Sequence, residues 1–312
     1  MMLTNVVDAY LSRQRSLGMR FESAGQLLCR FSRTMGNLKI DEVTPDAVAD
    51  FLLTKGALST TWMLKYKVLT GLYRFAVSRG YVNRSPLPEI LPNLPPQQTP
   101  YMYSTQELRR LVEATTTLRI GHSPSVPAMY RTLLLLLYGS GMRIGEALSL
   151  TLKDVDIAEQ VITVRDTKFF KTRLVPIGPK LTRELTEHIE RRRQLPMPGG
   201  NQSPFFTTRD GRAWSYPRVV SLFQHVRRAA EIYCPVGEPR PPRLHDLRHT
   251  AAVHRLLAWY RSGQDVQRLL PQLATYLGHI NIGSTQRYLQ MTPDLLQEAS
   301  QRFAHYATGG RS

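Results

Sequence analysis

Apolar residues recur at helical spacing along most of the chain, and this pattern predicts a mainly α-helical protein. Residues 1 to about 85 hold four amphipathic stretches. The third opens with Thr44-Pro45-Asp46, which combines a capping hydroxyl, a proline suited to the first helical position and an acid in the first turn. The fourth, residues 59–79, ends before Gly80, a usual helix stop. We therefore expect an N-terminal domain of four helices. The apolar positions of the fourth are Trp62, Val68, Leu69, Leu72 and Phe75.

A second domain is predicted from residue 101 to the end, residue 312, and it differs in pattern from the first. Three short segments in it alternate between apolar and polar residues and predict a small antiparallel β-sheet. They are residues 154–157, 161–165 and 173–177. The rest is helical in pattern, so we expect an α+β domain. Residues 86–100 contain many prolines and predict an extended linker between the two domains.

The boundaries of several helices in this second domain follow from local signals. Ser104 and Glu107 have the spacing of a capping box and predict a helix to about residue 114. After a looser segment at 121–126, a buried helix should run to Gly141. Further helices are expected at 180–194, at 216–233 with its arginines Arg218, Arg227 and Arg228 exposed, and from Thr292 onward, where Leu295, Leu296, Ala299 and Phe303 share a face.

Composition favours a nucleic-acid partner. The formal charge of +17 and pI near 10.2 give a strongly basic protein, and the excess of Lys and Arg spans both domains. The N-terminus lacks a signal-peptide pattern, and the longest apolar run is too short to cross a membrane, so we expect a cytoplasmic protein with no membrane partner. Cys29 and Cys234 lack the spacing of a zinc site and are interpreted as reduced structural residues.

The stretch from residue 242 to 290 carries the strongest candidate chemistry. On a helix beginning near His245, helical spacing places His245, Arg248 and His249 on one face. A guanidinium suits phosphate oxygens, and an imidazole exchanges protons near neutral pH. Tyr288, in a short segment that could form two helical turns, offers a phenol as a nucleophile. Each of these residues alone is more often solvated or packed in a core than functional.

Two further segments add to this set. In the sequence GSGMRIGEAL, a buried helix breaks at Gly139-Ser140-Gly141 and presents Arg143 at the start of a second helix that carries Glu146. In TKFFKTRLVPI, Lys168 and Lys171 lie in the turn between the second and third predicted strands.

Taken in chain order, these residues resemble the signature of the tyrosine recombinases, also called the phage integrase family. The matching positions are Arg143, Lys168, His245, Arg248, His279 and Tyr288. The resemblance is strong over residues 101–300 and covers 1–90 only in outline. Alignment with the family's hairpin favours Lys168 over Lys171, although Thr167 and Phe169 replace the glycines frequent there.

The resemblance implies a fold and a reaction. The fold is a SAM-like helical DNA-binding domain followed by an α+β catalytic domain that together clamp duplex DNA, with Lys65, Lys67 and Arg74 as candidate phosphate contacts. The reaction is cleavage and rejoining of DNA without a metal or small-molecule cofactor, by a homo- or hetero-tetramer on paired recombination sites.

Roles for the six residues follow from the same resemblance. Tyr288 would attack the scissile phosphate and form a 3′-phosphotyrosyl link, while Arg143 and Arg248 hold its oxygens. His279 would donate to the same oxygens, His245 would assist removal of the phenol proton, and Lys168 would protonate the leaving 5′-oxygen. Glu146 and Asp246 are candidates to hold an arginine or histidine in place, the alternative being surface acids at helix starts, and His249 is expected to support the fold.

Alternative functions remain open from the sequence. A type IB topoisomerase uses related chemistry without partner sites, and a DNA-binding accessory protein could keep the fold without turnover. A zinc site at His245 and His249, which are spaced i, i+4, lacks a third ligand at a fitting distance and the glutamate that follows the first histidine in zinc proteases.

Overall fold

The computed structural model describes residues 1–19, 21–53, 58–93, 99–118, 125–165, 172–238, 240–278, 283–286, 288, 297 and 300. The chain divides into two compact units, Met1–Gln98 and Thr99–Ser312. The fold is mainly α-helical with one small antiparallel sheet, as predicted. No helix among the described residues is both long and apolar enough to cross a membrane.

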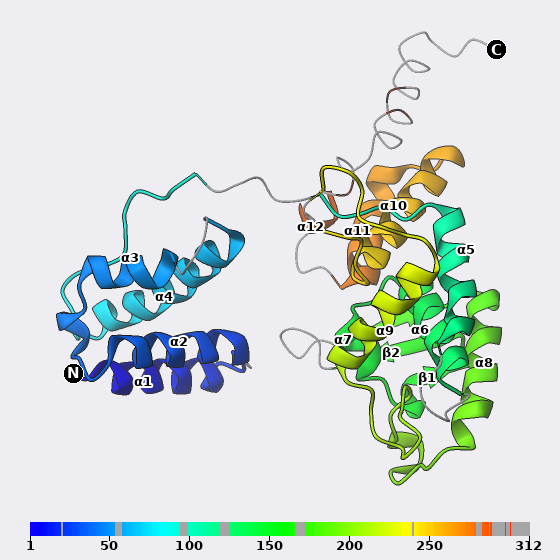
Figure 1. Ribbon diagram of the computed structural model, residues 1–312, viewed down its shortest axis with the longest axis horizontal. Helices are drawn as coiled ribbons and strands as arrows, with labels where there is room; N and C mark the ends of the chain where they lie inside the picture. Colours follow the sequence, from blue (N-terminus) through cyan, green and yellow to red (C-terminus); the bar gives the residue numbers. More distant parts are fainter. Residues whose placement is uncertain are drawn as a thin grey trace. The chain divides into compact units, whose positions relative to one another are not determined.

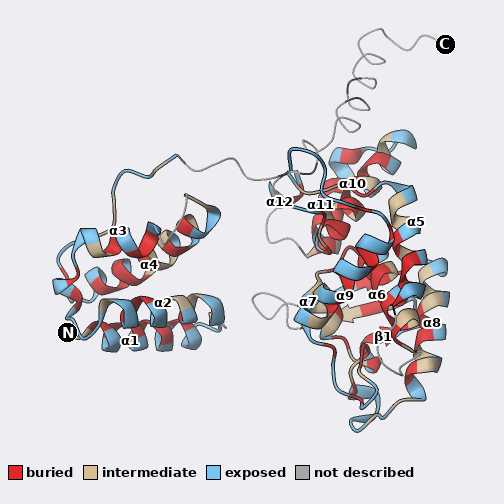
Figure 2. Ribbon diagram, in the orientation of Figure 1, coloured by how far each residue is buried: buried red, intermediate tan, exposed pale blue. Residues whose placement is uncertain are grey.

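In its described residues, the first unit contains four α-helices and a short 3-10 helix before the third. They are α1 (Leu3–Ser16), α2 (Glu22–Met35), α3 (Pro45–Leu53) and α4 (Thr60–Ser78), and the 3-10 helix is η1 (Ile40–Glu42). Their buried faces turn toward one another in Figure 2 and enclose a core rich in aromatic rings, with Phe31 packed edge-on against Phe51 at 4.9 Å between ring centroids. The four predicted helices are confirmed.

Lys65 corrects one expectation about this unit. Its side chain is buried, not exposed, and its ammonium donates a 2.5 Å hydrogen bond to the carbonyl of Phe51 near the end of α3. Helical spacing explains the placement, because residue 65 follows Trp62 by three positions and precedes Leu69 by four, and both of these are core residues. Lys67 is exposed on the same helix.

The second unit contains a three-stranded sheet of order β1-β2-β3. Figure 1 shows β1 and β2 among the helices of this unit. The strands β1 (Val155–Asp156), β2 (Val161–Val164) and β3 (Arg173–Pro176) are antiparallel, and Val164 faces Arg173 where β2 and β3 open toward their connecting loop. The helices are α5 (Thr105–Ala114), α6 (Ser125–Ser140), α7 (Ile144–Leu148), α8 (Pro179–Arg193), α9 (Tyr216–Ala229), α10 (Asp246–Arg261), α11 (Val266–Leu277) and α12 (Gly283–Gln286), with 3-10 helices η2 (Thr115–Thr117), η3 (Leu152–Asp154) and η4 (Gly200–Gln202).

Two clusters of buried apolar residues stabilise the described part of this unit. The larger one joins the sheet to α5, α6, α8 and α9. The smaller one lies between α10 and α11 and includes the ring of Tyr288. The side chain of the candidate nucleophile is therefore held by packing against α10 and α11.

Several local expectations were right and others were wrong. Ser104 and Glu107 form the predicted capping box. Val126, expected in a loop, lies inside α6, and α9 ends four residues before Tyr233. Arg227 is buried because it follows the core residue Phe223 by one helical turn, and its guanidinium donates to the carbonyl of Ile232 beyond the helix end at 2.6 Å. The helix expected from Thr292 lies outside the described residues.

The two cysteines also differ from expectation. Cys29 and Cys234 are free thiols, as predicted, but both are exposed and neither is a core residue.

Candidate active site

Three arginine side chains donate hydrogen bonds to main-chain carbonyls at the end of α11. The Nε of Arg173 donates to the carbonyl of Tyr276 at 3.1 Å, the Nη2 of Arg248 to that of Leu277 at 2.7 Å, and the Nη2 of Arg143 to that of Gly278 at 3.1 Å. The last carbonyls of a helix lack helical partners and carry the negative end of the helix dipole. This helix terminus therefore attracts cations and fixes their positions.

Gly278 makes this arrangement possible by ending α11 in the left-handed conformation, with φ of 68°. A side chain at this position would place its Cβ 2.8 Å from Nη1 of Arg173. Glycine is therefore required here both for its backbone conformation and for the close approach of the guanidinium.

Arg248, on the first turn of α10, is held on two sides. It is 3% exposed, and its Nη1 donates to the carbonyl of Gly141 at 2.6 Å in addition to the bond from its Nη2 to Leu277. Burial, followed by the nearby positive charge of Arg143, lowers the pKa of Arg248 to about 10, so it remains a cation at neutral pH.

Arg143 occupies the N-cap position of α7 and donates hydrogen bonds to Glu146. Its Nη1 donates to Oε1 of Glu146 at 2.8 Å and its backbone N–H to Oε2 at 3.0 Å, while its side chain remains 41% exposed. Glu146 also accepts two bonds from Arg173, at 3.1 and 2.7 Å. Burial of Glu146 acts to raise its pKa, but the bonds from Arg173 and Arg143 outweigh this effect and lower the pKa to about 2. Glu146 is therefore ionised and holds an arginine, as expected.

Tyr288 lies beside these cations. It is 3% exposed, and burial raises the pKa of its phenol, while the charge of Arg248 and a hydrogen bond with it act in the opposite direction. The phenol is therefore neutral at physiological pH and must lose its proton to act as a nucleophile. A cation in contact with it favours that loss.

Two histidine rings lie in a row between Tyr288 and solvent, first His249 and then His245. The ring of His249 lies 5.6 Å from that of Tyr288 and 4.9 Å from that of His245, with both pairs edge-on. Burial, followed by its histidine neighbour, lowers the pKa of His249 to about 4. His245 is exposed, and partial desolvation by the surrounding chain and the charge of Arg248 lower its pKa as well. Both rings are predominantly neutral at pH 7, and a neutral imidazole can accept a proton.

The structure thus brings together four of the six predicted residues: Arg143, His245, Arg248 and Tyr288. Lys168, its alternative Lys171, and His279 lie outside the described residues. The carboxylate of Asp246 accepts hydrogen bonds from the backbone N–H and the Nη2 of Arg243, at 2.8 and 2.9 Å, so the arginine that it holds is Arg243.

Arg173 is the residue that sequence reasoning missed. The alternation of β3 held a usable signal, since Arg173 shares the inner face with Val175, which is fully buried. An arginine on the buried face of a strand requires partners, and here they are Glu146 and the end of α11.

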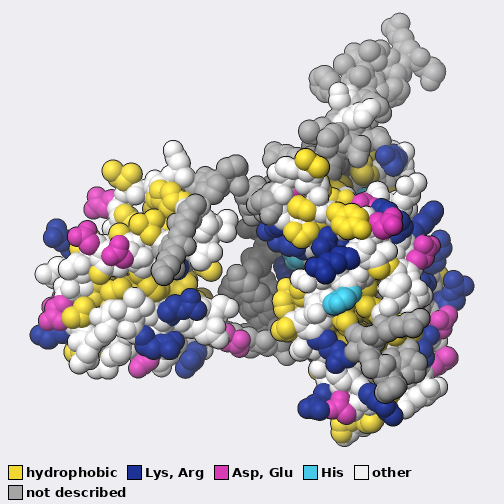
Figure 3. All heavy atoms as spheres, viewed as in Figure 1, with side chains coloured by type: hydrophobic (Ala, Val, Ile, Leu, Met, Phe, Trp, Pro, Cys, Tyr) yellow, Lys and Arg dark blue, Asp and Glu magenta, His cyan; other side chains and the backbone are white. Residues whose placement is uncertain are grey.

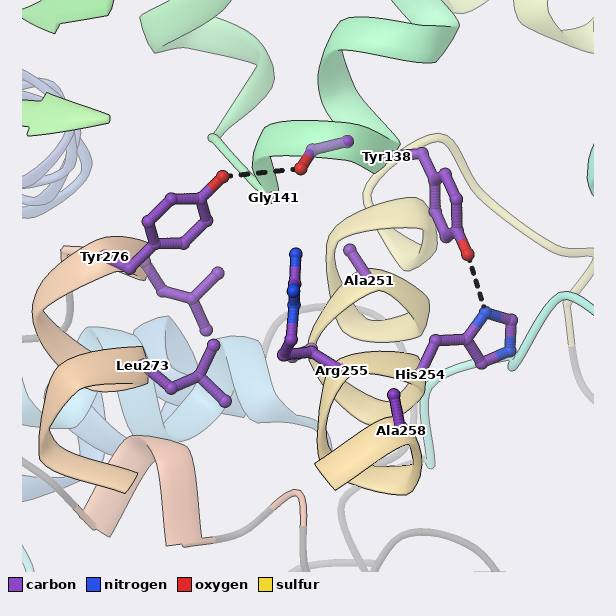
Figure 4. A pocket seen from close by; sticks show the side chains of 11 residues that line it. Tyr138, Gly141, Ala251, His254, Arg255, Ala258, Leu273 and Tyr276 are labelled. Carbon is purple, nitrogen blue, oxygen red and sulfur yellow. Dashed lines mark hydrogen bonds between the residues drawn. The ribbon is translucent and has the colours of Figure 1, made fainter. Parts of the chain in front are cut away.

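A pocket of about 220 Å³ adjoins this arrangement, between the end of α6 and the helices α10 and α11 (Figure 4). Gly141 and Leu277, whose carbonyls hold Arg248, form part of its wall, and the side chain of Arg255 lies in it. The hydroxyl of Tyr276 donates to the carbonyl of Gly139 at 3.3 Å across the pocket rim.

No group of three or more His, Cys, Asp or Glu among the described residues is arranged to hold a metal ion. Figure 3 shows Lys and Arg side chains on the surfaces of both units. A buried phenol in contact with one arginine, with a second arginine and two neutral imidazoles close by, defines a site suited to nucleophilic attack on a phosphodiester.

Comparisons with known proteins agree with this class of site. Residues 102–294 match the family model described as the phage integrase family. The chain is 31% identical over 299 residues to the putative integrase/recombinase y4rB of Sinorhizobium fredii, covering 95% of both proteins. It is 30% identical over 263 residues to the tyrosine recombinase XerC of Chlorobaculum tepidum, covering 80% of this chain and 74% of that protein. The chain belongs to the phage integrase family and is a tyrosine-type recombinase.

Solved structures share the fold. The Tn1549 transposon integrase in complex with a circular intermediate DNA superposes with a TM-score of 0.69 at 17% identity, covering 96% of this chain and 99% of that one. The site-specific recombinase XerH bound to its difH substrate gives a TM-score of 0.66 at 19% identity, covering 97% and 85%.

Proposed function

We propose that this protein is a site-specific DNA recombinase or integrase that cuts and rejoins duplex DNA through a 3′-phosphotyrosyl intermediate. The observation that carries the proposal is the contact of the buried Tyr288 phenol with Arg248, while Arg143 is fixed on the same helix end. The family model and the recombinases named above support the same reaction.

The proposed reaction is a transesterification. The Tyr288 oxygen attacks the scissile phosphorus, the bond from phosphorus to the 5′-oxygen breaks, and a free 5′-hydroxyl results. Arg143 and Arg248 bind the non-bridging oxygens and match the charge that builds in the transition state. His245 assists removal of the phenol proton, His279 donates to the phosphate, and Lys168 protonates the leaving oxygen. The arginines take the charge-stabilising role, so the step needs no metal ion.

We further propose that the protein acts as a homo- or hetero-tetramer on paired recombination sites, in the cytoplasm. The XerH and Tn1549 integrase structures are complexes with DNA, which supports a DNA partner here. The strongly basic composition supports the same partner. The biological setting would be integration or transposition of a mobile element, or resolution of chromosome dimers.

The decisive experiment uses a nicked duplex that traps the covalent intermediate. The site is first selected from random duplexes by binding to the full chain. Wild-type protein should form an adduct stable to denaturation at a DNA 3′ end, and Tyr288→Phe should form none while binding the duplex normally. Tyr130→Phe is the matched control, because Tyr130 is also a buried tyrosine but its hydroxyl bonds the carbonyl of Val219, in the core.

The outcomes separate the alternatives. If wild-type protein forms no adduct, or if Tyr288→Phe forms as much, catalysis by Tyr288 is wrong. Relaxation of a supercoiled plasmid that lacks the selected site would instead indicate a topoisomerase. Tight binding with undetectable cleavage would indicate an accessory DNA-binding protein.

A further inference from the structure

Arg173 connects three segments of the second unit through one guanidinium. Two of its nitrogens bond both carboxylate oxygens of Glu146 on α7, and its Nε bonds the carbonyl of Tyr276 at the end of α11. Arg173 itself begins β3, which pairs with β2 across the hairpin. The side chains of Arg173 and Glu146 are each only 10% exposed, so this bidentate salt bridge is largely shielded from water.

Tyr276 strengthens the same connection from the other end of the strand. Its hydroxyl lies 3.3 Å from the carbonyl of Pro176, the last residue of β3, while its own carbonyl accepts from Arg173, the first. The strand is therefore attached to α11 at both ends.

The charges at this point explain what Arg173 does for Arg143. Each carboxylate oxygen of Glu146 accepts one bond from Arg173 and one from Arg143. With both arginines present, the three groups carry one net positive charge, and the fork of Arg173 fixes the carboxylate. Without Arg173, Glu146 would balance Arg143 one to one and would be held only by its two bonds from Arg143. Arg143 would then present less positive charge, in a less fixed direction.

We propose that Arg173 is a positioning residue that shares Glu146 with Arg143 and so keeps the Arg143 guanidinium aimed and electropositive for the scissile phosphate. This inference rests on the proposed function for its catalytic consequence. Three of the five N–H donors of Arg173 are directed at Glu146 and Tyr276, so we assign it a role through Arg143 and not through the phosphate itself.

The test compares single-turnover cleavage of the nicked duplex by a set of variants. Arg173→Met should reduce the cleavage rate on the order of 10²-fold, with DNA affinity little changed, because misplacing a charge-stabilising group acts on the transition state. Arg173→Lys should lose less, since lysine keeps the charge but not the fork.

The double variant Arg173→Met with Glu146→Gln distinguishes a charge role from simple packing. Removing the charge of Glu146, which Arg143 then no longer shares with Arg173, should make cleavage by the double variant about tenfold faster than cleavage by Arg173→Met. If Arg173 only held the fold together, a second lost bond would lower the rate further. Arg165→Met is the matched control, because Arg165 bonds Asp154 at 2.7 Å near the same hairpin but outside the site, and its cleavage rate should be that of the wild type.

A readout that does not need cleavage keeps this inference separate from the proposed function. In the wild-type protein, the bonded Arg143 guanidinium protons should give slowly exchanging NMR signals, and Arg173→Lys and Arg173→Met should broaden or shift them, whereas Arg165→Met should not. If wild-type protein makes no adduct, the proposed function fails and these signals still decide the placement of Arg143. The inference would be overturned if the Arg143 signals were unchanged in the Arg173 variants. It would also be overturned if Arg173→Met cleaved at the wild-type rate, or if the double variant cleaved more slowly than Arg173→Met.

Discussion

Replacing Glu146 by glutamine should remove a pH-dependent contribution to the stability of the second unit. The folded protein lowers the pKa of this carboxylate from 4.5 to about 2. Such a shift corresponds to about 3 kcal/mol of unfolding free energy at neutral pH. Because the folded pKa is the lower one, this stabilisation is present above pH 4.5 and is lost as the pH falls toward 2. Glutamine does not titrate, so the variant lacks this dependence.

The measurement is urea unfolding followed by tryptophan fluorescence in a Trp62→Phe background, in which Trp214 and Trp259 report on the second unit. Between pH 6 and pH 3, the stability difference between the Glu146 protein and its glutamine variant should shrink by about 2 kcal/mol, since half or more of the shift is then titrated. Taking the difference cancels the other carboxylates. Glu113→Gln, a change at an exposed carboxylate on α5, is the control.

A stability difference that stays constant from pH 6 to pH 3 would refute the reasoning. It would mean that Glu146 contributes through hydrogen bonds that glutamine reproduces and not through its charge. A collapse of both proteins at the same pH with equal midpoints would lead to the same conclusion.

Two further predictions concern glycine and lysine positions. Gly278→Ala should destabilise the second unit by about 2 kcal/mol and slow cleavage, because it adds left-handed backbone strain and forces Arg173 away. Gly80 is the control position, because it has a φ of 69° and open space around it. Gly80→Ala should therefore show the backbone strain alone in thermal unfolding of the first unit. Lys65→Met should cost the first unit about 1–3 kcal/mol in urea unfolding without changing the salt dependence of DNA binding, because this lysine bonds a carbonyl inside the protein. Lys67→Gln, at an exposed position, should instead reduce the slope of log affinity against log salt by about 1 while leaving stability unchanged, and the opposite pattern for either lysine would contradict its assignment.

Much of the fold was accessible from the sequence because its signals are local. The spacing of apolar residues defines the helices, strict alternation defines β2, and the capping box at Ser104 defines the start of α5. The exact ends were less accessible. After α9, the guanidinium of Arg227 donates to the carbonyl of Ile232, and the spacing of apolar residues does not predict this side-chain bond.

The candidate site was accessible in part for a different reason. The residue types of Arg143, His245, Arg248 and Tyr288 indicate phosphate chemistry, and their order along the chain resembles a known family. The partners that hold them were not accessible, since they are carbonyls at the end of α11 and at Gly141, and main-chain oxygens carry no residue identity. Arg173 was missed because its role depends on a strand meeting a helix 103 positions later in the chain.

The three carbonyls at the end of α11 have a consequence for how this site tolerates sequence change. Side chains at positions 276 and 277 can be exchanged without deleting an acceptor, since every amino acid supplies the same oxygen. What cannot drift is the local bend of the chain that aims those oxygens, and that bend depends on a residue without a side chain at position 278. The geometry of this site therefore depends on backbone shape, and a substitution at Gly278 would change the direction of several cations at once.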